Sequence, residues 1–133
     1  MPSDFILSQA DGRPLYLQII EQIKQRIAVG DWPAGHPIPS IRQLAVDLEV
    51  SVITIKRAYL ELERDGLIAT QHGKGSVVAE RAGLASEIYE QALATHFEQV
   101  ARLGALLGLR AKDLQARLRD AVDRTEDTTK EHK

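Results

Sequence analysis

The sequence predicts a mainly α-helical fold that contains one small β-hairpin. Apolar residues recur at steps of three and four through most of the chain, which is the period of helices with one buried face. Glycine, proline and serine residues interrupt this pattern, so the helices are separate elements. Two runs rich in β-forming residues flank a glycine-containing turn at residues 72–75, as in a hairpin. These observations predict a winged helix-turn-helix domain over residues 1–79, followed by a two-helix segment over residues 80–124.

The first helix is predicted over residues 14–29. The apolar face that would form one wall of a core carries Tyr16, Ile19, Ile20, Ile23 and Ile27. Gly30, Pro33 and Gly35 follow closely, and because glycine and proline stop helices, the chain is expected to turn there. After this turn, residues 37–39 are predicted to be extended.

Two more helices, joined by a tight turn at residues 49–51, are predicted next. Ser40 and Gln43 have the spacing of a capping box, in which each side chain bonds to the other residue's backbone N–H. Ser51 is an N-cap candidate for a helix that extends to about Asp65. The buried face of the first of these helices is expected to carry Ile41, Leu44, Ala45 and Leu48. The buried face of the second is expected to carry Ile55, Ala58, Tyr59 and Leu62.

The opposite face of the second helix is a candidate binding surface. Its outward residues are Ile53, Arg57, Leu60 and Arg64, with Thr54 and Lys56 on the flanks. Gly66 is expected to end the helix in the left-handed conformation. Two short strands are predicted over residues 67–71 and 76–79, and Lys74 lies at the tip of the turn between them.

A different pattern follows residue 79. Ser86 can cap a helix that extends to Leu107, where Gly108 stops it. Six residues of this helix follow one another at alternating steps of four and three, which is the spacing of a helix packed against another helix. We call them the seam: Tyr89, Leu93, His96, Val100, Leu103 and Leu107. A second helix is predicted over residues 111–124, with Leu114, Leu118, Ala121 and Val122 on one face.

The seam is expected to mediate dimerisation, because two helices this apolar need a partner larger than each other. The alternative is that the seam packs back on the first helix as part of the chain's own core. His96 is the polar member of the seam, and it fits either a satisfied interface histidine or a pH-responsive one. Residues 125–133 are hydrophilic throughout and are expected to be disordered.

Composition restricts the class of protein. The chain has 133 residues, 44% of them hydrophobic, which is enough for one domain with an appendage. It has no cysteine, which excludes disulfides and thiolate zinc sites and is typical of the reducing cytoplasm. The N-terminal residues form neither a signal peptide nor a membrane span, so a cytoplasmic protein is expected.

Several motifs follow one another in a distinctive order over residues 14–79. They are PLYLQIIEQIKQRIAVGDWPAG, then PSIRQLA, then a helix ending LERDGLI, then GKGSVV. This order resembles the DNA-binding domain of the GntR family of bacterial transcription regulators. The segment AYLELERDGL and the short remainder of the chain resemble the YtrA subfamily, whose members append only a pair of helices for dimerisation.

The resemblance implies which residues contact DNA. They are the arginine of the PS-x-R motif, residues early in the recognition helix and the wing glycines, here Arg42, Ser51, Thr54, Lys56, Arg57, Gly73 and Gly75. Three neighbours complete the candidate set: Ser40, Val52 and Lys74. Many relatives have an arginine or asparagine at the position of Val52 and a glycine at that of Glu49, so their operator cannot be transferred to this chain. A purely structural role is the alternative for several candidates, since Ser51 and Thr54 also suit a helix start.

The charge balance bears on how DNA would be bound. Residues 1–79 contain 8 lysines and arginines against 9 aspartates and glutamates, and residues 80–133 contain 9 against 10. Neither half is therefore basic. Local placement of Arg42, Lys56, Arg57 and Lys74 on one surface must therefore supply the attraction. Dependence on a dimer follows, and the expected function is that of a homodimeric repressor that binds a palindromic operator.

Other functional classes find less support in the sequence. It has no nucleophile elbow, and GKGS at the wing lacks the remainder of a phosphate-binding loop, so an enzyme is not expected. The four histidines lack the spacing of metal ligands, and neither a metal nor a cofactor is expected. The alternative function is a protein-interaction module that uses Ile53 and Leu60 on a protein surface. A small-molecule effector cannot be inferred from these residues.

Overall fold

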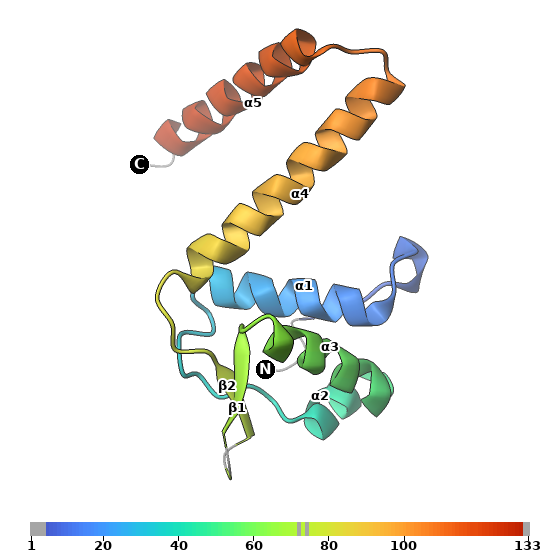
Figure 1. Ribbon diagram of the computed structural model, residues 1–133, viewed down its shortest axis with the longest axis vertical. Coiled ribbons are helices and arrows are strands. Elements are labelled where there is room, and N and C mark those ends of the chain that lie inside the picture. The colour runs from blue at the N-terminus through green and yellow to red at the C-terminus, as the bar shows by residue number, and fades with distance from the viewer. Residues whose placement is uncertain (1–4, 72, 74, 132–133) are drawn as a thin grey trace. The chain divides into compact units, whose positions relative to one another are not determined.

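The computed structural model describes residues 5–71, 73 and 75–131, which belong to two compact units, residues 1–89 and residues 90–133. The first unit contains a 3-10 helix η2 (Gln9–Asp11), helices α1 (Leu15–Ala28), α2 (Ile41–Leu48) and α3 (Val52–Arg64), and strands β1 (Ile68–Gln71) and β2 (Gly75–Val78). Helix α4 (Leu84–Leu106) begins in the first unit and continues in the second, which also contains α5 (Ala111–Glu131). Figure 1 shows these elements, and they confirm the predicted fold class of helices with one β-hairpin.

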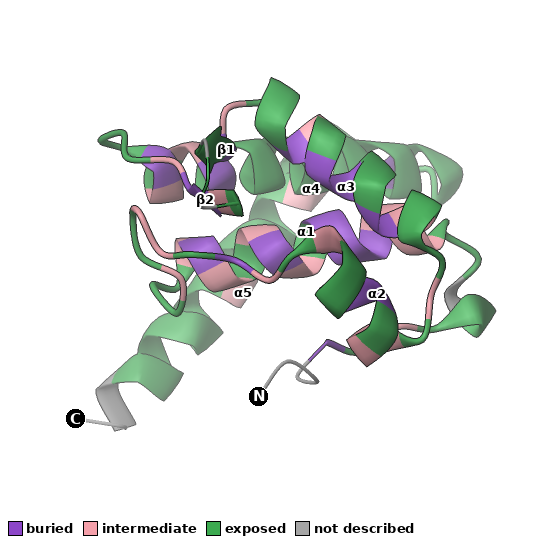
Figure 2. Ribbon diagram, turned by 90° about the horizontal axis from the view of Figure 1, so that it is seen from below, coloured by how far each residue is buried: buried purple, intermediate pink, exposed green. Residues whose placement is uncertain are grey.

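The core of the first unit lies between α1, α2 and α3. Ile19 and Ile23 of α1, Leu44 of α2, and Ile55 and Leu62 of α3 are completely buried. Figure 2 shows the buried residues as bands along these helices, beside mostly exposed residues on α3 and mostly half-buried ones on α1. The apolar stripes predicted for the three helices are therefore confirmed, and the burial of this aliphatic surface is the main stabilising contribution.

The β-hairpin pairs its two strands antiparallel. Ile68 pairs with Val78 at its base, and Gln71 pairs with Gly75 next to the turn. A third segment, which the sequence predicted only as extended, joins the other edge of β2. The backbone N–H of Val78 donates to His36, and Ile38 donates to Ser76, at 2.9 and 3.0 Å. The hairpin is thereby attached to the chain that leads into α2.

An N-terminal segment lies along α1, and the sequence pattern did not predict it. Gln18, a buried polar residue of α1, accepts a hydrogen bond from the Ser8 backbone N–H at 2.9 Å and donates to the Ser8 carbonyl at 2.8 Å. Gln22 makes the same pair of hydrogen bonds with Ile6. Phe5 is buried, and its ring lies 6.3 Å from that of Trp32. Two glutamine side chains therefore substitute for the backbone partners of an extended segment.

The start of α4 packs with the first unit, so the two compact units meet between Tyr89 and Glu90, whereas the sequence predicted a domain boundary after residue 79. The reason is that Leu84 and Ile88 are buried in the core of the first unit. The helix also begins before Ser86, which was expected to cap it. The Glu87 backbone N–H donates to the carbonyl of residue 83, so the first turn is already formed there.

Helix α5 continues to Glu131, which corrects the expectation that residues 125–133 are disordered. Residues 132 and 133 lie outside the described residues. The threonines of this segment donate their hydroxyl groups to backbone carbonyls one turn earlier, at 3.0 Å for Thr125, Thr128 and Thr129. These hydroxyls are thereby satisfied within the helix, so a hydrophilic composition alone does not end it.

Candidate nucleic-acid interface

The turn between α2 and α3 is fixed by the two predicted serine caps. Ser40 Oγ accepts a hydrogen bond from the Gln43 backbone N–H at 3.0 Å, and Ser51 Oγ accepts one from the Thr54 N–H at 3.2 Å. The Gln43 side-chain amide nitrogen donates to Asp47 Oδ1 at 2.8 Å, one turn later in α2. Glu49 ends α2 with a φ of 56°, a left-handed conformation that disfavours residues with a Cβ.

A buried tyrosine connects α3 to the start of α2. The Tyr59 hydroxyl donates to the carbonyl of Pro39 at 2.7 Å, directly before the Ser40 cap. Burial raises the pKa of this hydroxyl, so it remains a protonated donor. The hydrogen bond fixes the N-terminus of α2, and with it the backbone that carries Arg42.

The basic residues of the candidate set differ in their surroundings. Arg42 and Lys56 are exposed, and within the described residues neither has an ion-pair partner. Arg57 is held by α1: its guanidinium carbon lies 3.8 Å from the centre of the Tyr16 ring, and its Nη2 donates to the Tyr16 hydroxyl at 3.0 Å. Arg57 also lies 3.8 Å from Glu61, one turn later in α3. Two of these cations are therefore free for a ligand, and the third has intramolecular partners.

The first turn of α3 carries hydroxyl and aliphatic groups side by side. Ser51 and Thr54 share a hydrogen bond of 2.7 Å between their hydroxyl oxygens, so both serve the helix start. Val52 and Ile53 are 47% and 77% exposed, although both are aliphatic. About half of Val52 and most of Ile53 are therefore accessible at the surface of the domain.

The wing supplies the remaining candidates. Gly73 and Gly75 have φ values of 78° and 74°, and a Cβ at either position would meet no atom within 4 Å. The glycines are therefore needed for the backbone conformation and not for space within the chain. His72 and Lys74, the other residues of the predicted turn, lie outside the described residues.

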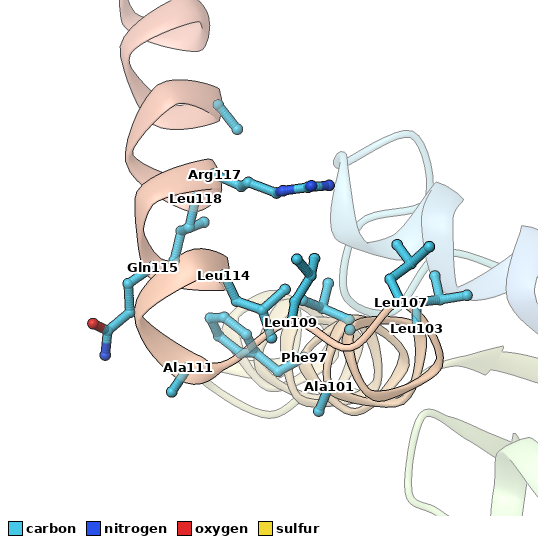
Figure 3. Close-up of a pocket in the computed structure, with 13 residues that line it drawn as sticks. Phe97, Ala101, Leu103, Leu107, Leu109, Ala111, Leu114, Gln115, Arg117 and Leu118 are labelled. Carbon is cyan, nitrogen blue, oxygen red and sulfur yellow. The ribbon is translucent and has the colours of Figure 1, made fainter.

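The second unit has an apolar groove between α4 and α5 (Figure 3). Its volume is about 580 Å³, and its lining includes the seam residues Val100, Leu103 and Leu107. Leu114 of α5 packs against Gly104 of α4, where an added Cβ would lie only 2.8 Å from a leucine methyl carbon. The groove is therefore formed where the two helices approach each other at a glycine.

All six seam residues are exposed in the single chain. His96 lies 3.3 Å from the Gln99 side chain of its own helix. Phe97 lines the groove and is 49% exposed. It was not predicted from the sequence, because it follows His96 directly and so falls outside the alternating steps that define the seam. The helical period alone could have identified it, since Phe97, Val100 and Gly104 follow one another at steps of three and four.

The described part of the chain contains no group of three or more histidine, aspartate and glutamate side chains arranged to hold a metal ion. Over the same residues, no helix combines the length and the apolar character that crossing a bilayer requires.

Comparison with known proteins identifies the first unit. Residues 15–78 match the family model described as bacterial regulatory proteins, gntR family. An uncharacterized HTH-type transcriptional regulator of Bacillus subtilis, YhcF, is 32% identical over 102 residues, which cover 77% of this chain and 84% of that protein. The HTH-type transcriptional repressor YtrA of the same organism is 41% identical over 69 residues, and the alignment covers 52% of this chain and about half, 53%, of YtrA.

The likeness extends to solved structures. A GntR family transcriptional regulator from Listeria monocytogenes superposes with a TM-score of 0.72 at 31% identity, covering 83% of this chain and 96% of that one. The shared region therefore includes much of the C-terminal helical segment as well as the winged domain. The resemblance to the GntR family and to YtrA, predicted from the motifs, is confirmed. The chain belongs to the GntR family of bacterial regulatory proteins, and it is a DNA-binding transcription regulator and not an enzyme.

Proposed function

We propose that the chain acts in the cytoplasm as a homodimeric repressor that binds a palindromic operator. The observation that carries this proposal is the outer surface of the helix-turn-helix, where Arg42 and Lys56 are exposed and free of ion pairs within the described residues. The related YtrA of Bacillus subtilis is a transcriptional repressor, which supports the same role for this chain. Helix α3 would enter the major groove, as the second helix of a helix-turn-helix does.

The contacts would divide between base edges and phosphates. Arg42 and Lys56 are the candidates for base edges or nearby phosphates, and the serines that cap α2 and α3 are exposed as well. The glycines of the wing would let its backbone approach the duplex, and Lys74, between them in the sequence, is the candidate for a phosphate contact. Arg57 already donates one hydrogen bond to Tyr16 and lies over its ring, so we propose that its contribution is the smaller one.

The second unit supports the dimer. Among its described residues no side chain is buried, and Gly104 alone falls in the buried class. A unit that leaves this much aliphatic surface in water has no core of its own, so it needs a second copy. Two copies that place the seam and the groove of one chain against those of the other would cover both surfaces symmetrically.

Alanine variants test the DNA-binding surface. The operator is the duplex that the full chain selects from a random pool. Arg42→Ala and Lys56→Ala should each weaken binding to it by about 1–3 kcal/mol if the side chains contact base edges. Arg57→Ala is the control on the same helix and should have the smaller effect. Fluorescence anisotropy at fixed salt measures the affinities, and circular dichroism confirms folding. Unchanged affinity in both test variants would show that this surface does not face DNA.

A further inference from the structure

The first turn of α3 presents aliphatic carbon where a recognition helix meets bases. The N-terminal residues of such a helix contact base edges in the major groove. Here Val52 is 47% exposed and Ile53 is 77% exposed. The hydroxyl groups beside them, on Ser51 and Thr54, bond to each other at 2.7 Å, and Ser51 Oγ also accepts a hydrogen bond from the Thr54 backbone N–H.

An aliphatic side chain can distinguish base pairs in the major groove through one feature. All other distinguishing groups at that surface are hydrogen-bond donors or acceptors, whereas thymine carries a methyl group at C5. If Val52 or Ile53 packed against a polar base edge, the donors and acceptors of that edge would lose water and gain no hydrogen-bond partner. Such a contact therefore disfavours G·C pairs. The chemistry of these two side chains therefore selects the thymine methyl.

We propose that Val52 and Ile53 determine operator specificity by packing against thymine 5-methyl groups in each half-site. This inference rests on the proposed function, because it names the bases that α3 recognises. Lys56 lies one helical turn after Val52, on the same side of α3, and is exposed. A half-site would thus combine a methyl contact with an adjacent contact from a cation.

Replacement of thymine by uracil tests the proposal, since it removes the methyl group and leaves base pairing unchanged. The full chain is first used to select its operator from random duplexes. Each thymine of that operator is then replaced in turn, at symmetric positions, and affinity is measured by fluorescence anisotropy at fixed salt. Loss of one buried methyl contact weakens binding about fourfold, so a symmetric replacement, which removes two, should weaken it about 15-fold at one or two positions of each half-site.

The variants Val52→Ala and Ile53→Ala connect the effect to these side chains. Each should bind the thymine operator more weakly and should discriminate less between thymine and uracil at its own position. Both side chains are exposed, so the variants should keep the melting curve of the original chain. Leu60→Ala is the matched control: it removes an exposed aliphatic group from α3, about 12 Å along the helix from Val52, and should leave the discrimination unchanged.

Three outcomes decide the matter. Methyl sensitivity that disappears in Val52→Ala or Ile53→Ala supports the proposal. Tight operator binding that is indifferent to every methyl group, or sensitivity that persists in both variants, overturns the methyl contact and leaves the proposed function intact. Failure to select any duplex overturns the proposed function and the methyl contact together.

Discussion

Carboxylates placed in the seam should convert the dimer into a monomer. Val100 and Leu107 are 44% and 68% exposed in the single chain, so that fraction of each side chain remains to be covered by a partner. Full burial of such a side chain is worth about 1.5–3 kcal/mol. Only the exposed fraction of each side chain gains this energy on association, and each position occurs in both chains. Together the two positions therefore contribute about 3–7 kcal/mol to association.

The double variant Val100→Asp/Leu107→Asp removes this contribution and brings four carboxylates into one interface. The dissociation constant should therefore rise by more than about 100-fold, and sedimentation velocity at micromolar concentration should show a monomer. The first unit should remain folded, because neither residue belongs to its core. Circular dichroism would show this as a retained cooperative melt.

Arg102→Asp is the matched control for this experiment. It places the same carboxylate on α4, between the two test positions in sequence but about 200° around the helix from Val100. The control should sediment as a dimer. A double variant that also remains a dimer would refute the assignment of the interface to the seam and move it elsewhere, for instance into the winged domain.

Four smaller changes test other parts of the structure. Tyr59→Phe leaves the Pro39 carbonyl without its donor and should lower the free energy of unfolding by about 1–3 kcal/mol in urea titrations, whereas equal stability would show that the hydrogen bond is dispensable. Glu49→Gly relieves a left-handed conformation and should raise the same quantity by about 0.5–1 kcal/mol, and a decrease would contradict this. Lys74→Ala should reduce the slope of log affinity against log salt by about one with little change in sequence preference. Gly104→Val should force α4 and α5 apart and weaken the dimer in sedimentation, so an unchanged dimer would show that their close approach is not required.

The sequence was sufficient to predict structural features that depend only on residues close together in the chain. Ser51 caps α3 through the backbone N–H three residues later, and Gly66 follows that helix with a φ of 79°, both as predicted. Such features require only a few residues in a fixed spacing. The buried stripe of α3 follows from its period in the same way, because Ile55 and Leu62 must share a face of any helix.

Contacts between distant segments could not be predicted in this way. Gln18 bonds to Ser8, ten positions away, and Arg57 bonds to Tyr16, 41 positions away. The family resemblance implies that Arg57 contacts DNA, and this stays a prediction, but nothing in the sequence of α3 showed that the Tyr16 ring of α1 would lie against its guanidinium. The buried first turn of α4 was missed for a similar reason, since Ile88 fits either a core or an exposed helix until the packing is known.

Selection from random duplexes, combined with the mass of the resulting complex, tests the central claim most directly. We expect two inverted half-sites whose centres lie roughly 10 base pairs apart, bound by two chains. Binding of one chain to a single asymmetric site would contradict a homodimeric repressor on a palindromic operator.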